Sequence, residues 1–376
     1  MMIIGRYKRI IFFVVSLLIV VLLAYVLQVF RSYNQQANIL GVQPTWVFRA
    51  DGEILSCLPE NNSGIFVYTP TAIYLVDSIT GELLWKTNLE EDTSIYRKYT
   101  IQTGIKSNEK VMVLQRDNGT VLSLSAKDGQ VLWEGESETN APIYDMGIDQ
   151  DFVYVTRLST SIVAYDAESG EKIWSKSVPD RTSLYLFPEN EKVFLGTGYM
   201  LFAYDARTGD LLVEHILDGL MRKMFADANN IYIAYLDGKY SFTSLDKETL
   251  EYRWSIPSSL LSLSEVNAML VKDDVVYVSG NKLVALSATN GEVLWVSDIE
   301  DVFGKPAIQN SFLVVQGRAR VYVLNKIDGT LIDNQKISGF VPLISWMFYS
   351  QANPCASETM IWLSSNSFLY AYDLTR

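Results

Sequence analysis

The chain carries few side chains that could support acid–base, nucleophilic or metal chemistry. His215 is the single histidine among 376 residues, so a histidine-based triad or a histidine-rich metal site has almost nothing to build on. Cys57 and Cys355 are the two cysteines, and their separation of 298 residues fits no zinc-binding or redox motif. We also find no aspartate-rich calcium loop. We therefore predict no catalytic, cofactor-binding or metal-ligating residue, and these residue types favour a binding protein over an enzyme.

An internal repeat supplies the elements that would position any site. Each repeat has an alternating apolar stretch, a polar turn and a second apolar stretch. The seven segments are residues 74–85, 122–133, 163–174, 202–213, 243–254, 284–295 and 322–333. The longest step between them, from Gly81 to Gly129, is 48 residues, and the shortest, from Gly291 to Gly329, is 38 residues. This period predicts a β-propeller with four antiparallel strands in each blade.

Each position of the repeat has a physical role. Asp or Ser opens the turn, because its side chain can accept hydrogen bonds from backbone amides two residues further on. Glycine closes the turn where a positive φ is needed. The turn glycines are Gly81, Gly129, Gly170, Gly209, Gly291 and Gly329, and Leu250 takes the place of one of them. Tryptophan follows four residues later, where its ring can dock against the next blade. The predicted docking tryptophans are Trp46, Trp85, Trp133, Trp174, Trp254 and Trp295.

The two ends of the repeat region complement each other. Residues 368–376 begin an eighth repeat and stop where the glycine and the tryptophan strand would follow. Residues 45–50 supply such a strand, with Trp46 in the docking position. We therefore predict an all-β, eight-bladed propeller whose ring is closed when the N-terminal strand completes the last blade. An open solenoid, the competing fold, would need no complementary ends.

The pattern in Asp166 to Trp174 resembles the tryptophan-docking repeat of the pyrroloquinoline-quinone (PQQ) propeller family, and the resemblance covers residues 45–376. Quinoprotein dehydrogenases of this kind hold PQQ beside a calcium ion and a vicinal cysteine pair. This chain has no adjacent cysteines. The propeller subunit of the outer-membrane β-barrel assembly machine is similar in size and blade number. That resemblance implies a protein-binding scaffold without a cofactor, although this chain has no lipid-modified cysteine.

The N-terminal region predicts a membrane anchor. Residues 10–30 are uncharged and long enough, as a helix, to span a bilayer of about 30 Å. Arg6, Lys8 and Arg9 precede them, which favours a cytoplasmic N-terminus. We expect a cytoplasmic tail over residues 1–9, a transmembrane helix over 10–30, a linker over 31–44 and an extracytoplasmic propeller over 45–376. A cleaved signal peptide is the rival, but it would need a shorter apolar core and a small-residue cleavage site.

The formal net charge is −12, which argues against a nucleic-acid partner. Acidic residues follow the fourth strands, while cations occupy the connections between second and third strands on the same face. The cations are Arg116, Arg157, Lys239, Lys282, Arg318 and Arg320. One hypothesis is a charged face that selects a partner, and the alternative is a set of ordinary solvated loops.

Cys57 and Cys355 fall in the first and last blades, which are neighbours in a closed ring. A disulfide between them would link the first and last blades covalently in an oxidising compartment, and two free cysteines are the alternative. The leading functional prediction is a single-pass, membrane-anchored scaffold or assembly factor that binds other envelope proteins. A PQQ- or other cofactor-dependent redox enzyme and a ligand-sensing domain that signals through a partner are the alternatives.

Overall fold

The computed structural model describes the repeat region with short gaps. The described residues are 41–60, 64–89, 105–116, 119–135, 143–157, 161–178, 184–189, 191–259, 266–300, 302, 304–317, 320–336, 355–357, 360–365 and 367–374. The predicted tail and anchor, and residues 31–40 of the predicted linker, lie outside this part of the chain. Within it, no helix is both long and apolar enough to cross a membrane.

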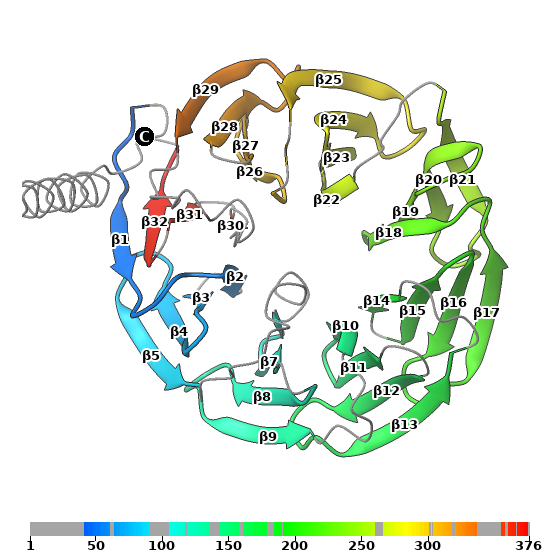
Figure 1. Cartoon of the computed structure of the whole chain (residues 1–376), viewed down its shortest axis with the longest axis horizontal. Coiled ribbons are helices and arrows are strands. Elements are labelled where there is room, and N and C mark those ends of the chain that lie inside the picture. Colours follow the sequence, from blue (N-terminus) through cyan, green and yellow to red (C-terminus); the bar gives the residue numbers. More distant parts are fainter. Residues whose placement is uncertain are drawn as a thin grey trace, which may run out of the picture.

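Eight four-stranded antiparallel sheets confirm the predicted blades. Figure 1 shows them arranged around a central axis, with consecutive blades following one another around the ring. Blade 1 contains β2 (Ser56–Glu60), β3 (Gly64–Tyr68), β4 (Ala72–Asp77) and β5 (Leu83–Asn88). Blade 2 contains β6 (Ile105–Ser107), β7 (Val111–Gln115), β8 (Val121–Ser125) and β9 (Val131–Gly135). Blade 3 contains β10 (Ile143–Ile148), β11 (Phe152–Arg157), β12 (Ser161–Asp166) and β13 (Lys172–Ser177).

The remaining blades repeat this order from the central axis outward. Blade 4 contains β14 (Leu184–Glu189), β15 (Lys192–Thr197), β16 (Met200–Asp205) and β17 (Leu211–Ile216). Blade 5 contains β18 (Met221–Ala226), β19 (Asn230–Tyr235), β20 (Tyr240–Asp246) and β21 (Tyr252–Pro257). Blade 6 contains β22 (Val266–Lys272), β23 (Val275–Gly280), β24 (Lys282–Ser287) and β25 (Val293–Glu300). Blade 7 contains β26 (Ala307–Gln309), β27 (Phe312–Gln316), β28 (Arg320–Asn325) and β29 (Leu331–Lys336).

Blade 8 is built from both ends of the described chain. It contains β30 (Cys355–Ala356), β31 (Ile361–Ser365), β32 (Phe368–Tyr372) and, as its outer strand, β1 (Trp46–Arg49). The pairing of β1 with β32 is antiparallel and runs from Trp46 opposite Ala371 to Arg49 opposite Phe368. A strand from the N-terminal side therefore occupies the position that β5, β9 and β13 occupy in their own blades.

The core lies between blades, because the middle strands bury side chains on both sheet faces. Every residue of β11 is buried, as is every residue of β19. One apolar cluster joins Tyr154 and Trp174 of blade 3 to Leu195 and Phe202 of blade 4. The near-continuous apolar runs of the second and third strands follow from this burial on two sides.

Each docking tryptophan contacts the turn of the following blade. The indole Nε1 of Trp174 donates to the carbonyl oxygen of Ala206 at 2.9 Å, and Trp254 donates to Ala288 at 2.8 Å. The ring lies against the turn glycine, since a Cβ added at Gly209 would come within 2.6 Å of the Trp174 ring. The remaining pairs are Trp46 with Gly81, Trp85 with Gly129, Trp133 with Gly170, Trp254 with Gly291 and Trp295 with Gly329.

Two outer strands lack the tryptophan. Val213 occupies the position in β17, and the turn that follows in blade 5 is the one closed by Leu250. Leu250 adopts a φ of 58° and donates its amide to Asp246 at 2.8 Å, the bond that Gly170 makes to Asp166 at 2.9 Å. Asp333 occupies the position in β29. A missing tryptophan in blade 4 is thus matched by a missing glycine in blade 5.

A disulfide links the first and last blades. Cys57 of β2 and Cys355 of β30 are joined with their Cα atoms 6.2 Å apart. Both residues are buried in the cluster that also contains Trp46 and Trp362. The bond therefore connects the two innermost strands on either side of the seam.

Candidate partner-binding site

The propeller has two faces with different connections. The turn face carries the turns between first and second strands and between third and fourth strands. The loop face carries the connections between second and third strands and from each fourth strand to the next blade. The five predicted partner-face cations that the structure describes fall in second-to-third connections or at the ends of the strands that flank them.

Several of these cations are engaged within the protein. Arg116 forms an ion pair with Glu134 at 3.0 Å, from Nη1 to Oε1. Arg157 is only 4% exposed, and its Nη1 donates to the carbonyl oxygen of Gly119 in blade 2 at 2.8 Å. Arg320 donates to the side-chain oxygen of Asn334. These three side chains hold loops and blades together.

The other predicted cations are placed differently. Lys239 and Lys282 are exposed, whereas Arg318 lies outside the described residues. The Lys239 ammonium group lies 5.0 Å from the centre of the Tyr240 ring. Tyr240 raises the pKa of Lys239, and the charge of Asp218 adds to this effect. Lys239 therefore remains a positive group at the loop face beside blades 4 and 5.

At the loop-face ends of blades 4 and 5, three large apolar side chains are exposed. Tyr199 is 48% exposed, Ile216 is 74% exposed and Leu236 is 60% exposed. We call these residues the apolar patch. Most other exposed apolar side chains, such as Leu83 and Val131, recur at the start of the outer strands and belong to the repeat. The apolar patch departs from the repeat, as expected of a site added to a common scaffold.

Backbone hydrogen bonds tie the three loops of the apolar patch together. The amide of Leu217 donates to the carbonyl oxygen of Tyr199 at 2.8 Å, and the amide of Leu236 donates to Leu220 at 2.8 Å. The amide of Leu220 also donates to Oδ1 of Asp237 at 2.9 Å. Loops from blades 4 and 5 are therefore fixed relative to one another before any partner binds.

A glycine makes this close approach possible. A Cβ at Gly219 would lie 2.4 Å from the backbone oxygen of Asp237, which is far inside contact distance. Beneath the loops, Leu217, Met221 and Tyr235 are buried in one cluster. The apolar patch thus rests on a packed base, and its side chains are presented with little ordering cost on binding.

Carboxylates lie close in the sequence to Ile216 and Leu236 of the apolar patch. Glu214, Asp218 and Asp237 are exposed, and Lys239 is the cation among them. His215 packs edge-on against the ring of Tyr252, with centroids 5.1 Å apart, and desolvation lowers its pKa. This neutral histidine leaves the rim predominantly negative, so the site fits an apolar segment with a basic flank.

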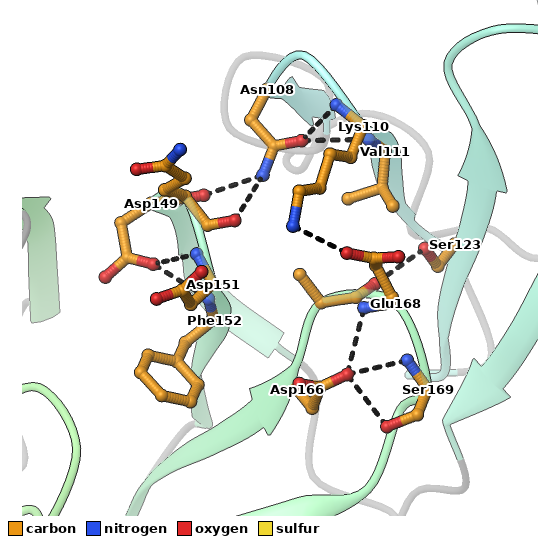
Figure 2. Close-up of polar contacts among 12 residues, drawn as sticks. Asn108, Lys110, Val111, Ser123, Asp149, Asp151, Phe152, Asp166, Glu168 and Ser169 are labelled. Atoms are coloured by element: carbon orange, nitrogen blue, oxygen red, sulfur yellow. Dashed lines mark hydrogen bonds and ion pairs between the residues drawn. The ribbon is translucent and has the colours of Figure 1, made fainter.

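The turn face shows a different use of charge. Figure 2 shows the junction of blades 2 and 3, where Nδ2 of Asn108 donates to the carbonyl oxygen of Asp149 at 2.7 Å. Lys110 of blade 2 pairs with Glu168 of blade 3 at 2.6 Å, from Nζ to Oε1. Further pairs between neighbouring blades are Asp151 with Arg207, Lys192 with Glu248 and Asp273 with Lys326. These cations are committed to blade packing.

Among the described residues, no group of three or more histidine, cysteine, aspartate or glutamate side chains is arranged to hold a metal ion. The sequence hypothesis of a charged face identified Lys239 but missed Tyr199, Ile216 and Leu236. The pairs Gly198-Tyr199 and Leu236-Asp237 follow second strands and have no equivalent in the other repeats. This was the sequence feature that could have indicated the apolar patch. Their exposure depends on three loops that meet only in the folded chain.

Comparison with known proteins identifies the family of this chain. A family model described as outer membrane protein assembly factor BamB matches residues 46–183, 119–212 and 158–375. The chain belongs to this family. The BamB protein of Shewanella oneidensis is 23% identical over 265 residues, which are 67% of this chain and 59% of that protein. This chain thus spans about three fifths of the length of that relative.

Two further matches cover more of the fold. The BamB protein of Yersinia pestis is 21% identical over 332 residues, 79% of this chain and 78% of that protein. The crystal structure of BamB from Moraxella catarrhalis has a TM-score of 0.64 and 19% identity, and covers 89% of this chain and 98% of that one. At this identity, the structural likeness establishes the shared propeller fold.

Proposed function

We propose that the protein is an extracytoplasmic scaffold or assembly factor that binds another envelope protein through the apolar patch on its loop face. The exposure of Tyr199, Ile216 and Leu236 on a hydrogen-bonded base carries the proposal. Exposed apolar side chains that gather in one place and have a polar rim are typical of protein-binding sites. Membership of the assembly-factor family supports the same role.

The proposed arrangement includes a tether and a closed ring. Residues 10–30 would anchor the N-terminus in the membrane, with the propeller outside the cytoplasm. The pairing of β1 with β32 would close the ring, so that a strand joined to the anchor becomes part of the last blade. Protease added to spheroplasts should digest the propeller; complete protection would contradict this topology.

A site-specific crosslinking experiment tests the binding site. A photoreactive amino acid is placed at Ile216 of the full-length tagged protein, and crosslinked products are identified by mass spectrometry. The matched control is Ile327, which is 75% exposed but lies in a turn of blade 7 on the turn face. We expect an envelope protein to be captured from position 216 and not from position 327.

Substitution then tests whether the apolar patch contributes to affinity. Ile216→Asp with Leu236→Asp should abolish the crosslink from a probe at Tyr199, because it adds like charges beside Asp218 and Asp237 and removes apolar contact. Ile327→Asp should leave the crosslink intact. Equal capture from both faces, or capture that survives the double substitution, would refute the proposed site.

A further inference from the structure

The outer strand of blade 4 differs from the other outer strands of the ring. β17 is the last strand of its sheet, and Figure 1 shows it on the outer rim of the propeller. All of its residues are exposed except His215, which is half-buried. Leu211 and Leu212 have exposed counterparts in other blades, whereas Val213 stands where Trp174 is buried in β13. β17 therefore lacks the indole contact that fixes other outer strands to the next blade.

β17 also lacks the residues that usually protect an exposed sheet edge. Proteins place lysine, other charged residues or proline on such edges, because unpaired backbone groups there can pair with a strand of another chain. β1, β5, β13, β21 and β29 each contain lysine, arginine or proline, whereas β9 and β25 keep a buried tryptophan. Among the described outer strands, β17 alone has neither feature, and Glu214 is its one charged residue.

The pairing of β17 with β16 determines which backbone groups face outward. The amide of Leu217 donates to the carbonyl oxygen of Tyr199 at 2.8 Å, and the register continues with His215 opposite Leu201. In an antiparallel pair, every second residue exchanges such bonds with the partner strand. The backbone amides and carbonyls of Glu214 and Ile216 therefore point away from β16, to the outer edge of the sheet. No other described strand pairs with this edge.

The outer edge of β17 is continuous with the apolar patch. Ile216 belongs to both and is 74% exposed. Glu214 and Asp218 are exposed carboxylates on either side of Ile216. Desolvation lowers the pKa of His215, which therefore adds no positive charge at neutral pH. A segment that lies along this edge meets apolar side chains and negative charge together.

We propose that an extended segment of the partner protein binds to β17 as a fifth strand of blade 4. The outward amides and carbonyls of Glu214 and Ile216 pair with its backbone, which supplies affinity, and its side chains supply selectivity. The segment has alternating apolar residues and a lysine or arginine beside Glu214, because opposite charges on paired strands attract. This inference rests on the proposed function, since it names the form in which the partner reaches the apolar patch.

Proline substitution tests the backbone pairing directly. Glu214→Pro removes an outward amide and leaves the bonds to β16 intact, so the blade should still fold. The matched control is Ser175→Pro, because Ser175 is exposed at the equivalent position of β13. A photoreactive amino acid at Leu236 of the full-length tagged protein measures capture of the partner in cells. We expect Glu214→Pro to reduce this capture by about tenfold, and Ser175→Pro to leave it unchanged.

Charge reversal tests the composition of the segment. Glu214→Lys should also reduce capture by about tenfold, because it places a like charge beside the lysine or arginine of the segment. The crosslinked peptide, identified by mass spectrometry, should contain alternating apolar residues and a lysine or arginine. The melting temperature of each variant shows whether it is folded, and Glu214→Lys decides the question if Glu214→Pro does not fold.

The outcomes separate strand addition from the proposed function. Capture from Leu236 that is unchanged in both Glu214 variants would overturn strand addition and leave the apolar patch as the binding site. Absence of capture from the original protein would refute the proposed function, and strand addition with it. Capture of a second copy of this chain would also overturn the proposal, because the edge would be occupied by that copy and not by another envelope protein.

Discussion

The junction between blades 3 and 4 and the junction between blades 4 and 5 differ in which blade supplies the large side chain that fills the contact. At the first, Trp174 crosses from blade 3, lies against Gly209 and donates to Ala206 at 2.9 Å. At the second junction, Val213 of blade 4 occupies the tryptophan position, and Leu250 of blade 5 occupies the glycine position. Tryptophan and glycine therefore form one unit across two blades, and at the junction of blades 4 and 5 both halves are absent.

Leu250 shows what replaces the missing ring. Its side chain is 1% exposed and packs in a cluster with Leu201 and Leu217 of blade 4. At the six junctions that have a tryptophan, the following blade contributes no side chain at this position, because a Cβ would collide with the indole. At this junction, the large apolar group comes from blade 5 instead, and the backbone retains the left-handed turn that glycine would adopt without strain.

The largest expected effect concerns the junction that has both a tryptophan unit and a covalent bond. Trp46 docks on Gly81 across the seam, where Cys57 and Cys355 are also bonded. The bond closes a loop of 298 residues, so the chain-entropy model gives a stabilisation of up to about 5 kcal/mol. Reduction should lower the free energy of unfolding by that order, measured by urea denaturation with and without reductant.

A double Cys57→Ser, Cys355→Ser variant is the control for this measurement. It should show the low stability in both buffers, because no bond remains to be reduced. Equal stability of the original protein in the two buffers, with both thiols labelled after unfolding in either, would show that the bond does not form.

Removing one tryptophan should have the next largest effect. Trp254→Ala deletes a ring that is 8% exposed and packs against Tyr232 and Phe242. It also removes the hydrogen bond to Ala288. We expect a loss of about 3–5 kcal/mol in the free energy of unfolding. Val213→Ala, at the equivalent position of blade 4, removes a side chain that is 36% exposed and should cost about 1 kcal/mol or less.

A double-mutant cycle tests whether the two halves of the unit are coupled. Val213→Trp alone should destabilise the protein, because the new ring meets Leu250 where other junctions have glycine. Leu250→Gly alone should leave a cavity. Together they rebuild the unit found at the junction of blades 3 and 4, so the double variant should be more stable than the sum of the single effects by about 1–3 kcal/mol. Strict additivity in urea denaturation would show that the two positions are not energetically coupled.

The fold was predictable from the sequence because each repeat contains residues whose local preferences favour the same strands and turn. Alternating apolar residues, an Asp- or Ser-led turn and a glycine at positive φ recur, so eight blades and their strands followed from pattern alone. The split last blade was predictable too, because Trp46 and the stretch after Phe368 are complementary halves.

The candidate site was harder to predict because it departs from the repeat. Arg116 directly follows a second strand and Arg157 ends one, yet Arg116 pairs with Glu134 and Arg157 is buried against Gly119. Sequence position cannot separate these from Lys239, which remains exposed. The apolar patch likewise needs contacts between loops of two blades. The pairing of Val213 with Leu250 was visible in the sequence, but its meaning required the contact of each tryptophan with the next blade.

The smallest expected effect concerns the carboxylate that opens the turn closed by Leu250. Asp246 accepts the amides of Thr249 and Glu248, each at 2.9 Å, and the bond from Thr249 is the main reason its pKa lies below the ordinary value of about 3.9. Its stabilising effect is therefore present above the unfolded-state pKa and is lost as the pH falls through the lower folded-state pKa. Because the group is partly exposed and screened, Asp246→Asn should reduce stability at neutral pH by less than about 1 kcal/mol.

The variant should also lose less stability than the original protein between pH 5 and the acid limit, as followed by urea denaturation at each pH. Ser287→Asn, at the equivalent turn of blade 6, removes no carboxylate and should leave the acid dependence unchanged. If Asp246→Asn and Ser287→Asn changed that dependence alike, the charge of Asp246 would not be what stabilises the turn that lacks glycine.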